Sequence, residues 1–239
     1  MKKAAAVALS LLIWSVAIVW FFFGALGVLL IGIFRAGSFF EAWVKGLCRS
    51  IVWICGIRIK VTGRENYQSG RQYILMMNHV NFFDGFVFYS SYPGKARGIE
   101  DESHFDWPVY GWVIRRMGQI PISRKSGIKA MESLRSAAAL IRRDSQMSCA
   151  VFPEGTRTRS GLLGPFKKGG FLLALETGLD ILPLIQLGAQ RINRSHSRLI
   201  RPGRIDFVIE KPIPLAGYTR ENITQLMEKV REVFLKYVE

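Results

Sequence analysis

A histidine and an aspartate lie five positions apart in the segment from Met77 to Gly85, and their chemistry suits proton transfer. Imidazole gains and loses a proton near neutral pH, and a nearby carboxylate fixes its tautomer and stabilises the charge that it acquires. The segment between the two residues contains no serine or cysteine nucleophile. His79 and Asp84 are therefore predicted to activate a hydroxyl that belongs to the substrate.

The elements around this pair place it at the end of a strand. The apolar run 73–77 predicts a buried strand that delivers Asn78 and His79, and a helix is expected to resume from Asp84 to Tyr92. Ligand sites of α/β sheets collect where strands end and helices begin. The spacing therefore spans a strand-to-helix turn of the kind that carries functional residues.

A second group of polar residues follows another predicted buried strand, 148–152. Gly155 and Gly161 permit a tight loop, and the guanidinium groups of Arg157 and Arg159 suit a phosphate. Glu154 places a carboxylate beside these cations. The alternative is a solvated basic loop without a ligand.

Two further segments add a cation and a proline. The segment Gly118 to Arg124 predicts a strand that ends in an arginine, and Pro183 interrupts an apolar strand at 181–188. Proline cannot donate to a sheet ladder. We therefore expect a local break in the ladder at Pro183.

From Ile57 onward, short apolar runs alternate with helical patterns, which predicts an α/β fold with a largely parallel central sheet flanked by helices. The alternating run 58–62 is typical of an edge strand. Further helices are expected at 107–117, 128–143, 166–176 and 220–237, and a last strand at 204–209. No internal repeat or low-complexity linker divides this part. The predicted organisation is a membrane-associated segment at 1–56 and one domain at 57–239.

The amino-terminal part predicts a membrane anchor. No charged residue occurs from Ala4 to Phe34, and about 20 apolar helical residues cross a bilayer core. A cleaved signal peptide is the alternative, although its apolar region is shorter. Positive charge flanks both ends of the run, which places both ends on the cytoplasmic side. A helical hairpin that dips into one leaflet satisfies this rule without a full crossing.

The second half of that hairpin is predicted to be an amphipathic helix over 38–56. Glu41, Lys45 and Arg49 recur every four residues on one helical face, which is typical of an interfacial helix. The alternative is that this helix packs on the catalytic domain.

The composition favours a membrane partner. The 239 residues include 33 lysines and arginines against 18 acidic residues, for a net charge of +15, and the mean hydropathy is +0.18. Basicity alone fits nucleic acid or an anionic membrane, but its combination with positive hydropathy favours the membrane and no nucleic acid. Three cysteines without paired spacing predict neither a disulfide framework nor a zinc site, and no metal is expected.

Together and in this order, the four segments resemble the glycerolipid acyltransferase family that includes the lysophosphatidic acid (1-acylglycerol-3-phosphate) acyltransferases. The matching features are the H-x-x-x-x-D pair at 79–84, the strand 118–124, the F-P-E-G-T-R run at 152–157 and the Pro183 strand. The likeness covers about residues 57–214 and the hydrophobic amino terminus. His104 and His196 match no motif of this family and are expected to be surface or structural residues.

The resemblance implies a role for each matching residue. His79 would be the general base on a free glycerol hydroxyl, and Asp84 would orient it. Arg124, at the end of its strand, and Arg157 would hold the acceptor phosphate. Glu154, Gly155 and Thr156 lie with Arg157 in the substrate-binding loop, and Glu154 would position the glycerol portion. Separately from the motif match, the backbone N–H groups of Ile122 and Ser123 are our candidates for the oxyanion donors.

The expected reaction moves a fatty acyl group from a thioester, acyl-CoA or acyl-acyl carrier protein, to lysophosphatidic acid, with no cofactor. The product, phosphatidic acid, would serve phospholipid biosynthesis at the cytoplasmic face of a membrane, with a bacterial inner membrane favoured. Glycerol 3-phosphate or a lyso-aminolipid is an alternative acceptor. Hydrolysis and a non-catalytic basic lipid-binding protein are further alternatives.

Overall fold

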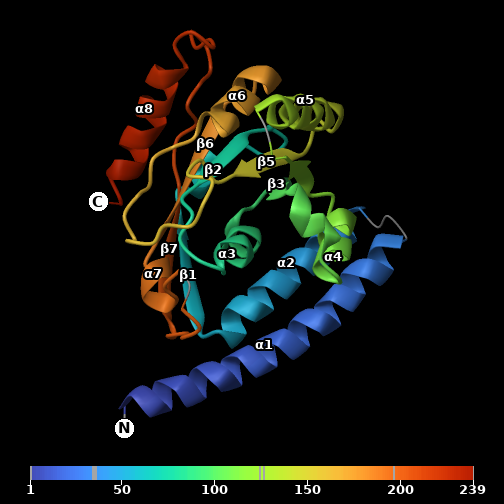
Figure 1. Cartoon of the computed structure of the whole chain (residues 1–239), viewed down its shortest axis with the longest axis vertical. Helices are drawn as coiled ribbons and strands as arrows, with labels where there is room; N and C mark the ends of the chain where they lie inside the picture. Colours follow the sequence, from blue (N-terminus) through green and yellow to red (C-terminus); the bar gives the residue numbers. More distant parts are fainter. Residues whose placement is uncertain (1, 34–36, 124, 126, 196, 239) are drawn as a thin grey trace.

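The computed structural model describes residues 2–33, 37–123, 125, 127–195 and 197–238, and within these residues a seven-stranded sheet forms the centre of the molecule (Figure 1). Its strands are β1 (Ile57–Thr62), β2 (Ile74–Met77), β3 (Ala96–Asp101), β4 (Ile120–Ile122), β5 (Ser148–Val151), β6 (Ile181–Leu187) and β7 (Gly203–Ile209). The spatial order is β1-β7-β6-β2-β5-β3-β4. All neighbouring strands are parallel except β6 and β7, which are antiparallel. The predicted largely parallel sheet is confirmed, with β1 at one edge.

Helices cover both faces of the sheet (Figure 1). They are α1 (Lys2–Ile33), α2 (Gly37–Ile54), α3 (Asp84–Ser91), α4 (Tyr110–Arg116), α5 (Gly127–Arg143), α6 (Lys168–Thr177), α7 (Ala189–Ile192) and α8 (Ile223–Leu235), with 3-10 turns at η1 (Arg64–Asn66) and η2 (Glu102–Asp106). Alternate residues of β2 serve the two faces. Leu75 packs in the cluster with α2 and α3, whereas Ile74 and Met76 pack with α5, α6 and α8. Burial on both faces explains why β2 is a continuous apolar run.

The break expected at Pro183 is present. Residue Leu184 pairs with Ile209 in the antiparallel ladder, and Ile181 pairs with Ile213 in an isolated bridge. Between these two pairs, the three residues 210–212 lie opposite the two residues 182–183, and the extra residue makes a β-bulge. The carbonyl oxygen of Pro183 accepts a hydrogen bond from the Glu210 N–H at 3.0 Å. The ring that cannot donate thus sits where regular pairing is interrupted.

Helix α1 lies along the outside of the molecule and packs on α2 (Figure 1). The two helices approach closely where α1 has no side chain, because a Cβ on Gly24 would lie 2.1 Å from Leu47 and one on Gly27 would lie 2.2 Å from Trp43. Near its start, α1 contacts the segment before β7, since Ser10 Oγ accepts from the Ile200 N–H at 3.0 Å. The helix therefore rests against the α/β domain.

The charged face of α2 is turned toward the α/β domain rather than toward lipid headgroups. Glu41 accepts a hydrogen bond from Arg97 at 2.7 Å, and the Lys45 ammonium donates to the carbonyl of Gly94 at 2.6 Å. The Arg49 side chain donates to the carbonyl of Ser90. The prediction of an interfacial charged face is therefore wrong, and the alternative of packing on the catalytic domain is confirmed. The reason is that carbonyls and an arginine of the domain satisfy these charges.

Most remaining predicted elements are present with shifted ends, but β3 was not predicted. This strand carries Arg97, Glu100 and Asp101 among its six residues and is only partly buried after Ala96, so it lacks a hydrophobic pattern. The predicted helix 107–117 is shorter, because η2 and an irregular turn precede α4. The proposed boundary at residue 56 falls in the turn between α2 and β1. The division into two parts stays a prediction.

Candidate active site

The predicted dyad forms at the carboxyl end of β2. Residue His79 follows the strand, Asp84 is the first residue of α3, and their Nδ1 and Oδ2 atoms lie 2.6 Å apart. The Asp84 side chain is 1% exposed and the His79 side chain 23% exposed. The carboxylate is thus sealed inside the protein while the imidazole keeps one edge toward the surface.

Four donors surround the buried carboxylate. Besides the His79 ring, Asp84 accepts from the backbone N–H groups of Val80 at 2.6 Å and Asn81 at 3.1 Å. The side chain of Gln186 donates its Nε2–H to Oδ1 at 2.5 Å. A carboxylate that leaves water needs such partners to offset the cost of burial. The turn from β2 to α3 supplies two of them from its own backbone.

The hydrogen bond to Asp84 sets the tautomer of His79. Because an ionised carboxylate only accepts, the Nδ1 atom carries the proton and Nε2 keeps its lone pair. The imidazole ring stacks on Phe152, with ring centroids 4.0 Å apart and planes 14° from parallel. The hydrogen bond to Asp84 and the stacking on Phe152 therefore hold the ring in place and leave Nε2 available as a base.

Asn78 and Gln186 brace the point where β2 ends, and sequence reasoning missed the second of them. The Asn78 side-chain amide pairs with the main chain of Gln186, accepting from its N–H at 2.9 Å and donating to its carbonyl at 3.0 Å. This amide continues the β2–β6 ladder by one step. The available signal was a single glutamine in the apolar strand 181–187, and Gln186 is only 2% exposed.

Glu154 binds backbone rather than an open surface. One carboxylate oxygen accepts from the His79 N–H at 2.8 Å, and the other accepts from the Gly164 N–H at 2.8 Å. Burial raises the pKa of Glu154, against the lowering effect of those two hydrogen bonds. With both oxygens engaged and 3% of the residue exposed, Glu154 is placed to position His79 rather than to contact the glycerol portion of a substrate.

The loop that follows Glu154 is fastened to His79 at both ends. The Glu154 carboxylate accepts from the His79 N–H, and the Thr158 N–H donates to the His79 carbonyl at 2.9 Å. Gly155 bends the loop with a φ of 65°, which glycine adopts without strain. The side chains of Thr156 and Arg157 between these anchors are exposed. The exposed guanidinium group of Arg157 therefore lies within three residues of both hydrogen bonds that join this loop to the backbone of His79.

The described part of the third segment, residues 118–123, lies further from the dyad than its predicted role requires. Strand β4 is separated from β2 by β5 and β3, which at one strand spacing each amounts to about 14 Å. The Ser123 N–H donates to Ser133 Oγ at 3.2 Å, so it is not a free oxyanion donor. The strand order therefore places Ile122 and Ser123 away from His79, and it does not support them as oxyanion donors. Arg124 lies outside the described residues.

The cysteines and the other histidines are not placed for catalysis in the described part of the chain. Cys55 and Cys149 are fully buried, and burial raises the pKa of each thiol to about 12. His104 pairs with Glu100 at 2.8 Å and contacts the Trp107 ring, which confirms its structural role. His196 lies outside the described residues.

Comparisons with known proteins show the family of this chain. An acyltransferase family model matches residues 58–186. The chain is 30% identical to a 1-acyl-sn-glycerol-3-phosphate acyltransferase of Limnanthes douglasii, over 84% of this chain and 70% of the relative. It is 29% identical to one of the same name from Borreliella burgdorferi, over 79% of this chain and 74% of the relative.

A solved structure shares the fold. The crystal structure of the 1-acyl-sn-glycerophosphate acyltransferase PlsC from Thermotoga maritima superposes with a TM-score of 0.83 at 24% identity, covering 98% of this chain and 94% of that one. The family model spans the dyad, the arginine loop and the strand that carries Pro183. This chain therefore belongs to the acyltransferase family.

Proposed function

We propose that this protein transfers a fatty acyl group from an acyl thioester to the free hydroxyl of lysophosphatidic acid. The observation that carries the proposal is the state of His79. Its ring is bound to Asp84 at 2.6 Å, and among the described residues the ring makes no hydrogen bond to a serine, threonine or cysteine side chain. A base without a protein nucleophile fits a substrate hydroxyl as its partner. The relatives' names supply the acceptor.

The chemistry then proceeds without an acyl-enzyme. The Nε2 atom of His79 takes the proton from the glycerol hydroxyl as its oxygen attacks the thioester carbonyl, and Asp84 stabilises the resulting imidazolium. The new ester C–O bond forms as the C–S bond breaks. The imidazolium returns the proton to the departing thiolate, so His79 ends the cycle neutral. The donor thiol leaves as a free thiol.

Arg157 is the proposed site for the acceptor phosphate. Its loop is fastened to the backbone of His79, and no carboxylate pairs with the Arg157 side chain in the part of the chain that the structure describes. A guanidinium group binds two phosphate oxygens at once. Arg124 is a second proposed phosphate ligand on the family pattern. A phosphate held by these groups would fix the distance from the glycerol hydroxyl to Nε2.

The membrane is the proposed source of the acceptor. Among the described helices, one is long and apolar enough to cross a bilayer, over Ala4–Ile33 with a mean hydropathy of 2.6. That helix contacts the domain near both ends, at Ser10 and at Gly32. We propose that α1 lies lengthwise in one leaflet on the cytoplasmic side, where its exposed apolar face meets lipid. In a bacterium, this is the inner membrane.

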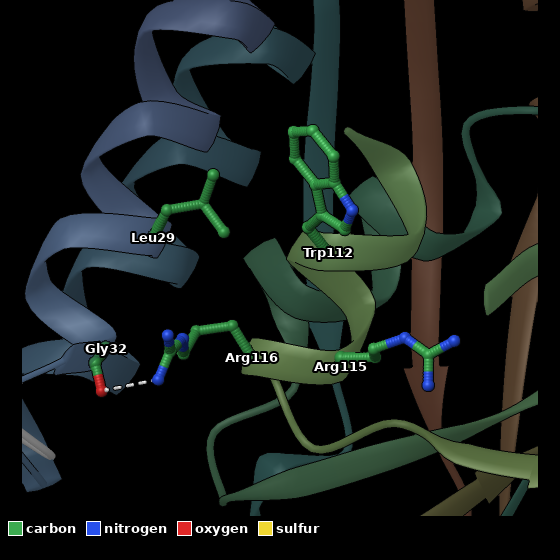
Figure 2. Close-up of a pocket in the computed structure, with 5 residues that line it drawn as sticks. All are labelled: Leu29, Gly32, Trp112, Arg115 and Arg116. Carbon is green, nitrogen blue, oxygen red and sulfur yellow. Dashed lines mark hydrogen bonds between the residues drawn. The ribbon is translucent and has the colours of Figure 1, made fainter. Parts of the chain in front are cut away.

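A groove beside the end of α1 fits this orientation. It has a volume of about 630 Å³ and lies between α1 and α4, and Figure 2 shows Leu29 and Gly32 facing Trp112 and Arg116 across it. The Arg116 side chain donates to the Gly32 carbonyl at 3.4 Å. Tryptophan and arginine at the end of an apolar helix are typical of the headgroup level of a membrane.

The test is an acyl-transfer assay on the purified full chain in mixed micelles. Lysophosphatidic acid, glycerol 3-phosphate and a lysolipid without phosphate are each offered with acyl-CoA and with acyl-acyl carrier protein. We expect the highest turnover with lysophosphatidic acid. Activity confined to the acceptor without phosphate would overturn the role of Arg157. Release of free fatty acid without any acceptor would show hydrolysis instead.

A further inference from the structure

We propose that Gln186 is a positioning residue for the acyl-transfer dyad, which holds Asp84 against His79 from the neighbouring strand. The inference rests on the proposed function of the dyad and extends it to a residue that no sequence motif singled out. Gln186 lies near the end of β6, next to the point where β2 ends. It does not touch the reacting atoms, so it would act through Asp84.

One amide nitrogen spans the whole turn. The Nε2 atom of Gln186 donates to Asp84 Oδ1 at 2.5 Å and to the Asn78 carbonyl at 3.2 Å. Asn78 immediately precedes the catalytic histidine and Asp84 starts α3. The glutamine therefore bridges the last residue before the histidine and the carboxylate that orients it. A displacement of the strand relative to the helix would have to break one of these bonds.

The orientation of the Gln186 amide is set by Asp84. The Oε1 atom is buried and has no hydrogen-bond partner among the described residues. Reversing the amide would place this oxygen against the Asp84 carboxylate and replace attraction with repulsion. An unsatisfied buried acceptor is rare and calls for an explanation. Here Oε1 is left unpaired because the amide orientation that lets Nε2 donate to both Asp84 and the Asn78 carbonyl gives it no donor.

The surroundings of Gln186 do not otherwise favour a polar side chain. Its neighbours Leu184 and Ile185 are fully buried, and an apolar residue of similar size would avoid the unpaired oxygen. The amide, however, gives Asp84 Oδ1 a side-chain donor at 2.5 Å, shorter than the 3.1 Å bond from the Asn81 N–H to the same oxygen. That donor draws negative charge from Oδ1, which moderates how strongly the carboxylate holds a proton on the imidazole.

This role predicts a specific pH effect. Without the donor, the Asp84 carboxylate is less stabilised, so the dyad as a whole binds a proton more tightly. His79 must be neutral to act as a base, and the acid limb of kcat/KM therefore moves to higher pH. We expect Q186L to shift that limb upward by about one pH unit and to lower kcat about 10-fold, with a smaller change in KM.

A second variant tests the sign of the interaction. In Q186E the introduced carboxyl faces Asp84, and two adjacent carboxylates cannot both ionise without cost. In its protonated form the new carboxyl can donate to Oδ1 as the amide does. We expect Q186E to recover activity relative to Q186L at low pH and to lose it as the pH rises. A role limited to packing predicts no such crossing of the two profiles.

Q72L is the matched control. Gln72 precedes β2 at the opposite end of the strand and donates to the carbonyls of Ile141 and Met147. Its replacement removes side-chain hydrogen bonds of the same kind without touching the dyad. We expect Q72L to lower thermal stability and to leave the acid limb of the pH profile in place.

The experiment measures pH profiles of kcat and kcat/KM for the unmodified chain of 239 residues and the three variants, with lysophosphatidic acid as acceptor. A ¹⁵N spectrum of His79 follows its Nδ1–H tautomer independently of turnover. The role of Gln186 would be overturned if the wild type is active and Q186L, with unchanged stability, gives the same pH profile. An inactive wild type would instead overturn the proposed function. A Q186L variant that fails to fold leaves Q186E and the ¹⁵N spectrum to decide the question.

Discussion

The turn at 78–84 and the loop at 155–159 are neighbours in space but differ in how their polar atoms are used. In the turn, the Asp84 carboxylate accepts hydrogen bonds from four donors and is almost completely buried. In the loop, the side chains of Thr156, Arg157 and Arg159 are exposed. Within the turn, Asp84 binds the ring of His79, and the loop is joined to the backbone of His79 through Glu154 and Thr158.

The difference matches two kinds of work. Proton transfer needs a fixed donor–acceptor geometry before the substrate arrives, because misplacement raises the barrier. Phosphate binding instead needs cations that are not already paired. Because both segments contact His79, a phosphate bound by the loop would lie at a fixed distance from the His79 ring. Substitutions in the turn should therefore change kcat, and substitutions in the loop should change KM.

The largest effect is expected from H79A. Loss of the base should lower kcat by about 10³-fold, within the range typical of general-base catalysis, and leave membrane association unchanged. Rates in mixed micelles and co-flotation with vesicles measure the two properties. H104A is the matched histidine control and should keep its rate, because His104 pairs with Glu100 away from the dyad. A fully active H79A would contradict the assignment of the base.

The next effect is expected from R157A, which should act on binding. We expect KM for lysophosphatidic acid to rise about 10- to 100-fold, the value of a lost charge-assisted hydrogen bond, with a smaller change in kcat. R159A removes an exposed arginine two residues further along the loop and should raise KM less. Equal effects of the two variants would indicate a diffuse electrostatic field instead of a site at Arg157.

E154Q should change how stability depends on pH. Because burial raises the folded pKa of Glu154 above its ordinary 4.5, the native state binds the proton more tightly than the unfolded state. The contribution of this group to stability is present below pH 4.5 and is lost as the pH rises through the folded pKa. E154Q lacks this loss, so the stability difference between variant and wild type should shift in favour of the variant as the pH rises. Chemical denaturation from pH 4 to pH 8 measures it, and a pH-independent difference would contradict the sign.

The smallest effect is expected from E41Q, away from both segments. Arg97 and Glu41 join β3 to α2 with side chains 23% and 12% exposed, so losing the pair should cost about 1 kcal/mol of unfolding free energy. The exposed pair of Lys229 and Glu232 offers the control E232Q, which should cost less than about 0.5 kcal/mol. Equal costs would mean that α2 is not held by its charged face.

The sequence predicted the dyad and its turn because both depend on local order. A buried strand, a polar turn and a helix follow one another directly, and the structure has β2, His79 and α3 in that sequence. Gln186 was not predicted, because it reaches Asp84 from a strand 102 positions away. The role given to Glu154 also changed, since no pattern shows that its oxygens bind backbone N–H groups.

Longer-range packing explains the other differences. The charges of α2 have the spacing of an interfacial helix, and only the fold reveals that Arg97 and two loop carbonyls lie opposite them. Strand β3 was missed because three of its six residues are charged, and its arginine is satisfied by that same helix. The environment of the charged residues on one element thus depends on partners far away in the sequence, which the sequence pattern of that element does not reveal.

The most direct test of the account is whether acyl transfer occurs without a covalent intermediate. The purified protein is mixed with its acyl donor, with and without lysophosphatidic acid, and both free thiol and intact protein mass are followed. The account predicts no burst of thiol and no acyl adduct on the protein until the acceptor is added, after which thiol and phosphatidic acid form in equal amounts. A stoichiometric burst of thiol without acceptor, with the acyl mass retained on the protein, would contradict direct attack by a hydroxyl that His79 activates.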